Sequence, residues 1–278
     1  MDLKEYKQQE ITKKMQDVEL GILKEIDRIC KENNIKFFSS GGTFLGSVRH
    51  KGFIPWDNDV DIGMYRDEYE KFIEIAPKKI NEPYEVHTYR NCESHHYYMA
   101  HVVDTRYAVR RIGSIDQRVE NIWVDVFPYD GFPNNPFVRN LHYIRLDFCR
   151  FMFHLAWFET VNITRKDRKL LQKVMINALR KTYKSFRPSK TKWRERIDLL
   201  LKKNDFKDCN YIANYIGIKG RKEIFPKYIF EDLKEYAFED MKLLAPVDAE
   251  YVLSQLYGDY MSIPSKAERQ CHPVEIIN

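Results

Sequence analysis

Apolar residues near the start of the chain recur every three or four positions between 11 and 30, the spacing of an amphipathic helix. Asn33 and Asn34 end this pattern. The next apolar run, 35–38, is short and predicts a buried strand. A turn of two serines and two glycines at 39–42 leads out of that strand.

The following stretch again combines helical and strand-like spacing. Residues 43–48 fit one or two helical turns that begin at the glycine turn. A second strand is expected at 60–64, and a helix at 66–76 that ends before Pro77. Strand, glycine turn and helix start therefore follow one another closely, an arrangement that suits phosphate binding.

Strand patterns dominate the middle of the chain and helical patterns the segment after it. Four stretches rich in Val, Ile and Tyr lack internal prolines, namely 84–89, 97–103, 107–112 and 121–127. Strand signals then vanish from 134 to 216, and they return at 236–244 before a helix at about 248–257. The chain is thus expected to be a single α/β (α+β) domain over 1–278, with a mixed sheet flanked by helices and a helical insert at 134–216.

Composition is that of a globular protein in a reducing compartment. Of the 278 residues 44% are hydrophobic, enough to bury a large core without disulfides. The five cysteines are scattered and form no CxxC pair. The first ten residues are charged, and no apolar run reaches the roughly 18 residues of a membrane span. A cytoplasmic location, with possible peripheral contact at the inner membrane surface, is the expectation.

Charge is distributed unevenly along the chain. The segment 139–203 holds 18 Lys and Arg against 5 Asp and Glu, a net +13, while the remainder carries −8. An acidic body suits bound cations, and a basic segment suits an anionic acceptor or membrane surface. A solvated helical face explains the basic segment equally well. The aromatic residues of 148–158 fit burial or a subunit contact better than a lipid interface.

The densest chemical signal lies between 41 and 62. Gly41, Gly42 and Thr43 open a helix, where backbone N–H groups approach a phosphate closely and the helix dipole attracts it. Side chains alternate along a strand, so Asp59 and Asp61 share one face. Two such carboxylates hold hard divalent cations, Mg²⁺ or Mn²⁺, through oxygen ligands.

A third carboxylate on a neighbouring strand would complete the metal site. Asp125 is the candidate, because it stands alone among bulky apolar residues where an unpaired acid is costly to bury. Two metal ions roughly 3.5 to 4 Å apart can hold the attacking and leaving oxygens of a phosphoryl displacement. Arg49, Lys51 and Arg66 are placed in sequence to neutralise donor phosphates. In the alternative interpretation, Asp57 to Asp61 form a polar turn and Asp125 is a capping or paired acid.

The stretch SGGTFLGSVRHKGFIPWDNDVDIGMYRDEYEKF at 40–72 resembles the signature of the LicD family of phosphorylcholine transferases, whose relatives include fukutin-related sugar-alcohol phosphate transferases. WVDVFPYDG at 123–131 and YGDYM at 257–261 extend the resemblance over most of the chain. It implies a nucleotidyltransferase-like fold, a divalent metal, a CDP-linked donor and a glycan acceptor such as teichoic acid, capsule or lipopolysaccharide. It also implies that Asp59, Asp61 and Asp125 bind the metal.

Two positions depart from the family pattern. Asn58 stands where Asp is usual, and Tyr65 where Pro is usual. Strand alternation turns residue 58 away from its neighbours, so a change of Asn58 to Asp is expected to be nearly silent. Asp57 would share the face of Asp59 and Asp61, with a positioning role or that of a solvated turn acid.

Other polar residues carry weaker expectations. Tyr257 and Asp259 follow a predicted helix, and they contact the donor or belong to a local cap that Gly258 forms. His272 is a possible donor-phosphate contact or a plain tail histidine. The histidines of 95–101 lack the cysteine that would complete a zinc site, and strand alternation splits them between two faces.

Two other functions compete with phosphotransfer from a CDP-linked donor. A nucleotidyltransferase proper would use the same carboxylates but release pyrophosphate from an NTP. A nucleic-acid-binding module would act through the basic segment, yet the sequence contains no helix-turn-helix or zinc-finger motif, and its aromatic and basic runs do not interleave. No nucleic-acid partner is therefore expected, and an oligomer remains open.

Overall fold

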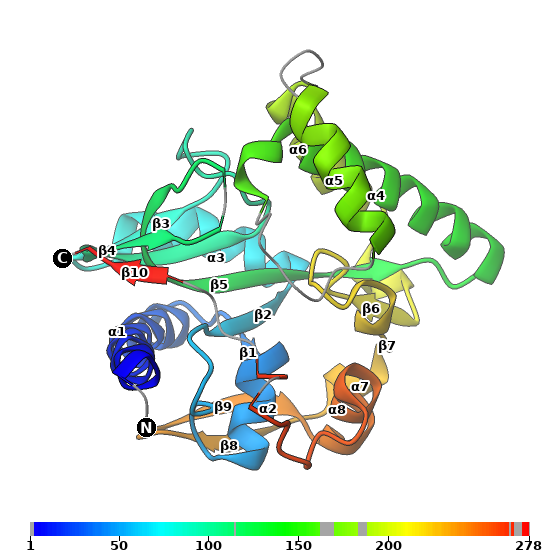
Figure 1. Cartoon of the computed structure of the whole chain (residues 1–278). Coiled ribbons are helices and arrows are strands. Elements are labelled where there is room, and N and C mark those ends of the chain that lie inside the picture. The colour runs from blue at the N-terminus through cyan, green and yellow to red at the C-terminus, as the bar shows by residue number, and fades with distance from the viewer. Residues whose placement is uncertain are drawn as a thin grey trace.

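A mixed eight-stranded sheet forms the centre of the computed structural model, which describes residues 3–113, 115–161, 170–182, 188–266, 268–269 and 274–277 (Figure 1). Its main path runs β1-β2-β5-β4-β10, with β3 beside β4 and β6 between β5 and β7. The strands are β1 (Phe38–Ser39), β2 (Asp61–Tyr65), β3 (Tyr84–His87), β4 (Ala100–Arg111), β5 (Val119–Phe132), β6 (Tyr211–Ala213), β7 (Ile224–Pro226) and β10 (Val274–Ile276). The expected mixed sheet flanked by helices is confirmed.

The parallel pair β2 and β5 sets the register at the centre of the sheet. Asp61 lies opposite Asp125, and Gly63 opposite Phe127. The pairs β1 with β2 and β4 with β5 are antiparallel. Gly63 is required here because a Cβ would lie 2.5 Å from the Phe38 ring.

Helices cover the sheet and complete the core. The apolar spacing predicted for 11–30 belongs to a longer helix, and its positions Ile22 and Ile26 are fully buried. The helices are α1 (Leu3–Glu32), α2 (Gly41–Arg49), α3 (Arg66–Lys79), α4 (Pro136–Ala156), α5 (Leu170–Thr182), α6 (Lys190–Leu201), α7 (Tyr228–Glu231) and α8 (Ala249–Tyr257), with 3₁₀ turns η1 (Phe158–Thr160), η2 (Phe206–Asp208) and η3 (Gly220–Glu223). Among the described residues, no helix combines the length and the apolar character that crossing a bilayer needs.

Two hydrophobic clusters divide the core between them. Val60, directly before β2, and the β2 residues Ile62 and Met64 pack with α1 and α3. Phe127 and Tyr129 of β5 pack in the second cluster, with residues of α2, α4, α6 and α8. This division leaves the side of β2 that carries Asp61 facing α2 and the C-terminal elements.

Several expected boundaries change in the structure. The strands predicted at 97–103 and 107–112 form one strand, β4, with a register shift between Asp104 and Ala108 that hides the continuity. The expected strand at 236–244 is a hairpin of β8 (Leu233–Phe238) and β9 (Met241–Pro246).

The helix predicted to stop before Pro77 continues through that residue. Pro77 lies inside α3, and Ile80 N–H still donates to Ala76 O at 2.9 Å. A proline near the end of a helix removes one backbone bond without preventing the last turn, so the predicted end at 76 is wrong.

The segment 134–216 is largely helical, as expected, but not entirely. Helices α4 and α6 pack against one another, and Phe148 of α4 meets Trp193 of α6 with ring centroids 5.6 Å apart. Strand β6 lies within the segment and extends the sheet beside the end of β5. The three residues of β6 are too few to produce a visible alternation in sequence.

Candidate functional site

Carboxylates gather where β2 begins. Asp61 is the first residue of that strand, and Asp57 and Asp59 precede it in a segment without regular secondary structure. Asp125 lies directly opposite Asp61 on the parallel strand β5, and neighbouring strands lie about 4.8 Å apart. The sequence-predicted pairing of these two positions therefore occurs in the fold.

The glycine turn packs directly against these acids. Gly41 has φ +50°, and a Cβ there would lie 2.8 Å from Asp61 Oδ2. A Cβ on Gly42 would lie 2.8 Å from Asp57 Oδ2. Thr43 Oγ1 accepts the Asp61 N–H at 2.8 Å. These residues have small or hydroxyl side chains because the start of α2 must approach the carboxylates closely.

The acidic cluster consists of Asp57, Asp59, Asp61 and Asp125, and crowding raises the pKa of two of its members. Burial, followed by the charges of Asp59 and Asp125, raises the pKa of Asp61 well above its ordinary value. Burial and the neighbouring Asp59 also raise the pKa of Asp57. Asp59 is thus close enough to Asp57 for its charge to disfavour ionisation of the Asp57 carboxyl group. No Lys or Arg among the described residues forms an ion pair with Asp57 or Asp61.

Glu19 of α1 is an acid of this cluster that sequence reasoning missed. Its side chain is buried, and its Oε2 has no hydrogen-bond partner. Burial, then the charges of Asp59 and Asp125, raise the pKa of Glu19 well above its ordinary value. The available signal was its position, four residues after Met15, on the apolar face of the predicted helix.

Glu223 of η3 is a second missed acid. Its Oε1 accepts the Lys219 N–H at 2.8 Å, and a Cβ on Gly217 would lie 2.1 Å from the same oxygen. Burial raises the pKa of Glu223 to about 7, although the Lys219 N–H and nearby cations oppose the shift. The charge of Glu223 contributes to the raised pKa of Asp61 and of Tyr257. No sequence pattern marks this residue, because it reaches the site only through the fold.

The carboxylate of Asp125 faces a different neighbour from the other acids. His101 Nε2 lies 2.7 Å from Asp125 Oδ1, and Trp123 Nε1 donates to Asp125 Oδ2 at 3.2 Å. The histidine contact is close, but its angles are not those of a hydrogen bond, so Oδ1 remains buried without a hydrogen-bond donor.

The cluster has the donor set of a hard divalent cation. Buried oxygens without hydrogen-bond donors on Glu19 and Asp125, and the mutual repulsion of Asp57, Asp59 and Asp61, are features that a bound cation would relieve. Among the described residues, however, no three His, Cys, Asp or Glu side chains converge closely enough to hold one ion together. Like charges repel at this site, which opposes convergence.

The three cations expected to contact donor phosphates lie in different environments. Arg49, at the end of α2, donates through Nη1 to Tyr260 O at 2.6 Å and to Ser262 O at 3.2 Å, so it ties the C-terminal region to α2. Lys51 is exposed on a turn with φ +59°. In the sequence, Arg49 and Lys51 both lie within ten residues of Asp57.

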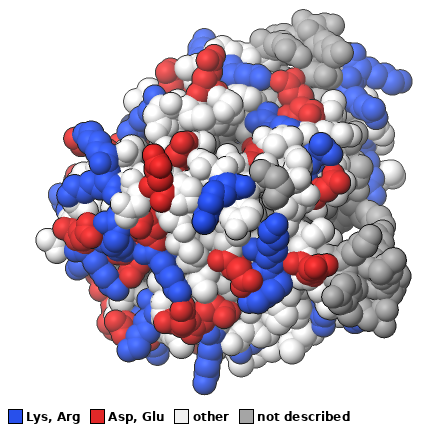
Figure 2. Space-filling model, turned by 90° about the vertical axis from the view of Figure 1, so that its left-hand side faces the viewer, with Lys and Arg blue, Asp and Glu red and all other residues white. Residues whose placement is uncertain are grey.

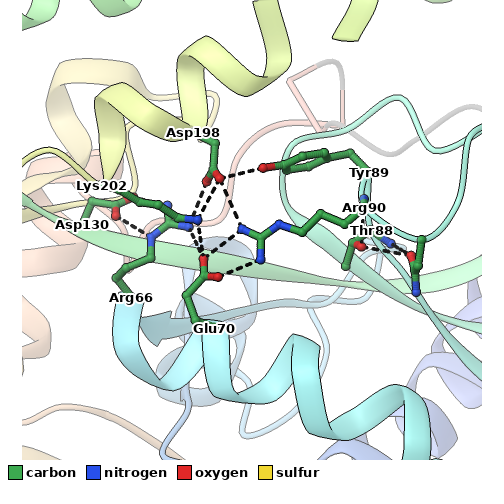
Figure 3. Close-up of polar contacts among 9 residues, drawn as sticks. Arg66, Glu70, Thr88, Tyr89, Arg90, Asp130, Asp198 and Lys202 are labelled. Atoms are coloured by element: carbon green, nitrogen blue, oxygen red, sulfur yellow. Dashed lines mark hydrogen bonds and ion pairs between the residues drawn. The ribbon is translucent and has the colours of Figure 1, made fainter. Parts of the chain in front are cut away.

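Arg66 is buried in a network of ion pairs (Figure 3). Its Nε and Nη2 donate to both oxygens of Asp130 at 2.7 Å, and its Nη1 donates to Glu70 and Asp198 at 3.1 Å. Four of its five N–H donors are thereby engaged. The expectation that Arg66 binds donor phosphate is corrected: this side chain joins α3, β5 and α6.

The candidate residues near the C-terminus differ in their positions. Tyr257, the last residue of α8, has its pKa raised well above the ordinary value by burial and then by the charge of Asp61. Gly258 has φ +73° and caps the helix through its N–H to Ser254 O at 2.8 Å. Asp259 is exposed and accepts the Ser262 hydroxyl. His272 lies outside the described residues.

The two departures from the family pattern have structural consequences. Asn58 is 1% exposed and donates to Met15 Sδ at 3.3 Å, so a carboxylate there would be buried beside Asp57 and Asp59. This burial favours a destabilising effect of Asn58→Asp, in place of the silent change that strand alternation alone predicts. Tyr65 ends β2, and its hydroxyl donates to Phe230 O.

The histidines at 95–101 form an aromatic cluster. The rings of His95 and His101 lie 4.7 Å apart, and His95 Nε2 contacts Met99 O at 2.8 Å. His96 Nδ1 contacts Arg118 at 2.5 Å. Burial lowers the pKa of His95 to about 2.

Comparison with known proteins gives several similarities. Residues 34–159 match a family model described as the LicD/FKTN/FKRP nucleotidyltransferase domain. The lipopolysaccharide cholinephosphotransferase LicD of Haemophilus influenzae is 29% identical over 266 residues, which cover 92% of this chain and 93% of that protein. The human ribitol 5-phosphate transferase FKRP is 38% identical over 40 residues, or 14% of this chain and 8% of that protein. The matched domain contains the glycine turn, Asp57 to Asp61 and Asp125, whereas Glu19 and Glu223 lie outside it.

Proposed function

We propose that this chain transfers a phosphate-linked small group from a CDP-activated donor to a sugar of a surface glycan, because residues 34–159 match the LicD/FKTN/FKRP nucleotidyltransferase model. Phosphocholine is the first candidate, since the relative with 93% of its length matched is named a lipopolysaccharide cholinephosphotransferase. Lipopolysaccharide is the first acceptor to test, followed by teichoic acid and capsule. The buried acidic cluster inside the matched domain supports this proposal most directly.

The proposal includes a divalent cation, Mg²⁺ or Mn²⁺, held by Asp59, Asp61 and Asp125. When bound, it would neutralise the donor diphosphate and stabilise the charge that develops on the leaving phosphate. Asp57 and Glu19 would then add negative charge around the ion. The absence of a Lys or Arg ion pair to Asp57 or Asp61 among the described residues supports this role, because burial of several carboxylates without cations is costly.

Other residues of the chain have separate parts in the proposal. The N–H groups of Gly42 and Thr43, at the start of α2, would bind a donor phosphate oxygen. Arg49 and Lys51 would supply positive charge to the same diphosphate.

The alternative is transfer of a nucleoside monophosphate from an NTP. It would use the same carboxylates, so the products separate the two reactions. A CDP-linked donor yields CMP, whereas an NTP yields pyrophosphate.

The test is to incubate the protein with CDP-choline, extracted lipopolysaccharide and Mg²⁺ or Mn²⁺, and to measure CMP. CMP formation that depends on both acceptor and metal is expected, and Asp61→Asn should lower turnover by roughly two orders of magnitude or more because electrostatic stabilisation is lost. Asp67→Asn is the matched control, since Asp67 is exposed nearby on α3. Full turnover in EDTA, near wild-type turnover of Asp61→Asn, or pyrophosphate from CTP in place of CMP contradicts the proposal.

A further inference from the structure

Helix α4 has an apolar face on each side. One face is buried in the core through residues such as Leu146 and Phe153. The opposite face is exposed although it too is apolar. Its members follow one another at intervals of four and three residues, the spacing of a single stripe along a helix. They are Phe137 (79% exposed), Leu141 (41%), Ile144 (55%), Phe148 (56%) and Phe151 (47%).

This stripe runs along most of the helix. The helix has 21 residues, which at 1.5 Å each span about 30 Å. The outward face of a surface helix normally carries charged and polar residues. Scattered exposed apolar residues need no explanation, but a continuous exposed stripe indicates a contact with a partner or a membrane.

Exposed cations outnumber exposed acids in the region of the stripe. Arg145 lies on α4 itself, and Lys192 and Arg196 lie on α6, which packs against α4. The exposed cations of the described part of the segment 139–203 are Arg145, Lys173, Arg180, Lys181, Lys192, Arg196 and Lys203. Four acids lie in that part: Glu159 is paired with Lys190, Asp198 is held in the network of Figure 3, Asp147 accepts the Tyr215 hydroxyl, and Glu195 is exposed.

The face of the molecule toward α1 and β4 differs from this region. Figure 2 shows Lys and Arg intermingled there with Asp and Glu. Many of these charges are paired along α1, for example Lys13 with Asp17 and Arg28 with Glu32. The face in Figure 2 therefore lacks the excess of one sign that the α4 to α6 region has beside its exposed apolar side chains.

We propose that the exposed stripe of α4 docks on an anionic lipid surface. Phe, Leu and Ile side chains would enter the interface while the flanking Arg and Lys side chains contact lipid phosphates. A second copy of this chain is the less suitable occupant, because two segments of net +13 would repel one another. The proposal concerns a surface distinct from the acidic cluster and stands whether or not the proposed transfer is correct.

Vesicle co-sedimentation tests this surface. The wild-type protein should bind phosphatidylglycerol vesicles, bind phosphatidylcholine vesicles far more weakly, and release in high salt, because screening weakens attraction to anionic lipid. The variant Leu141→Asn/Ile144→Asn/Phe148→Asn should bind phosphatidylglycerol vesicles about tenfold more weakly or worse, since the inserted apolar area is lost.

A matched control replaces three exposed aliphatic residues at another edge of the molecule, in the variant Ile112→Asn/Val119→Asn/Ile277→Asn. Their exposed fractions, 51%, 54% and 44%, match those of the stripe. Vesicle binding by this control should equal that of the wild type, and circular dichroism should show all three proteins folded. The proposal is overturned if the wild type does not bind phosphatidylglycerol vesicles or if the α4 variant binds them equally well. A wild-type dimer that the α4 variant dissociates would likewise overturn it, in favour of a self-interface.

Discussion

His101 Nε2 lies 2.7 Å from Asp125 Oδ1, and these two residues face one another directly across strands β4 and β5. Asp61 faces Asp125 from the other side, on β2. Three polar side chains thus form one row across three adjacent strands. The His101 ring also stacks on Trp123, with ring centroids 5.5 Å apart and planes 12° apart, so the imidazole is held in place beside the carboxylate.

This row predicts that His101 positions Asp125. Loss of a partner that orients a metal-ligating carboxylate typically costs 10 to 100-fold in metal affinity or activity, and His101→Leu should weaken Mn²⁺ binding by about that factor. His101→Gln, whose amide nitrogen can approach the position of Nε2, should recover part of the loss. Titration calorimetry with Mn²⁺ measures both, and unchanged affinity of His101→Leu would show that the contact is only structural.

Gly41 offers a test of the close approach between α2 and Asp61. Gly41→Ala should lower transferase turnover strongly, because the new Cβ lies 2.8 Å from Asp61 Oδ2. Gly220→Ala is the matched control: Gly220 has φ +55°, similar to the +50° of Gly41, but no atom lies within 4 Å of its Cβ position. Both variants bear a left-handed backbone cost of about 1 to 2 kcal/mol, so equal turnover in the two would contradict the assigned role.

Glu223 should make stability depend on pH. Its pKa of about 7 in the folded protein exceeds the roughly 4.3 of an unfolded glutamate, so the folded state binds the proton more tightly. Wild-type stability should therefore fall as pH rises from about 4.3 to about 7, relative to Glu223→Gln, by on the order of 3 kcal/mol in total. Urea unfolding in EDTA at several pH values measures the difference. Glu231→Gln, at an exposed site, should show no such trend.

The Arg66 network predicts a pH effect of opposite sign. Burial alone would raise the pKa of Asp198, but Arg66, Lys202 and Tyr89 outweigh it and lower that pKa. Asp198→Asn should cost on the order of 3 kcal/mol at pH 7, because buried cations lose their partner. The deficit is complete above about pH 4 and should vanish as pH falls through the lowered pKa of Asp198. A deficit that persists unchanged at pH 2 to 3 would contradict this assignment, as would an equal cost for the exposed Asp67→Asn.

The sequence alone determined the parts of this protein that depend on local pattern. The three-and-four spacing of α1, the alternation around Asp59 and Asp61 and the glycine turn are all visible within a few residues of one another. Asp125 was also predictable, because an acid amid bulky apolar strand residues needs a partner. The motifs that contain these features resemble those of the LicD family, and residues 34–159 match the model of that family.

Only the tertiary structure decided which distant side chains join them. Glu19 and Glu223 approach the acidic cluster from α1 and η3, and nothing in their local sequence indicates which carboxylates they will face. Arg66 lies five residues after Asp61 in the sequence. In the fold it forms ion pairs with Asp130 and Asp198, because a buried guanidinium must be paired. The apolar residues of α4 show the same limit. Their spacing predicts a helix, but whether a given face is buried or exposed depends on what packs against it, and that is determined only when the whole chain has folded.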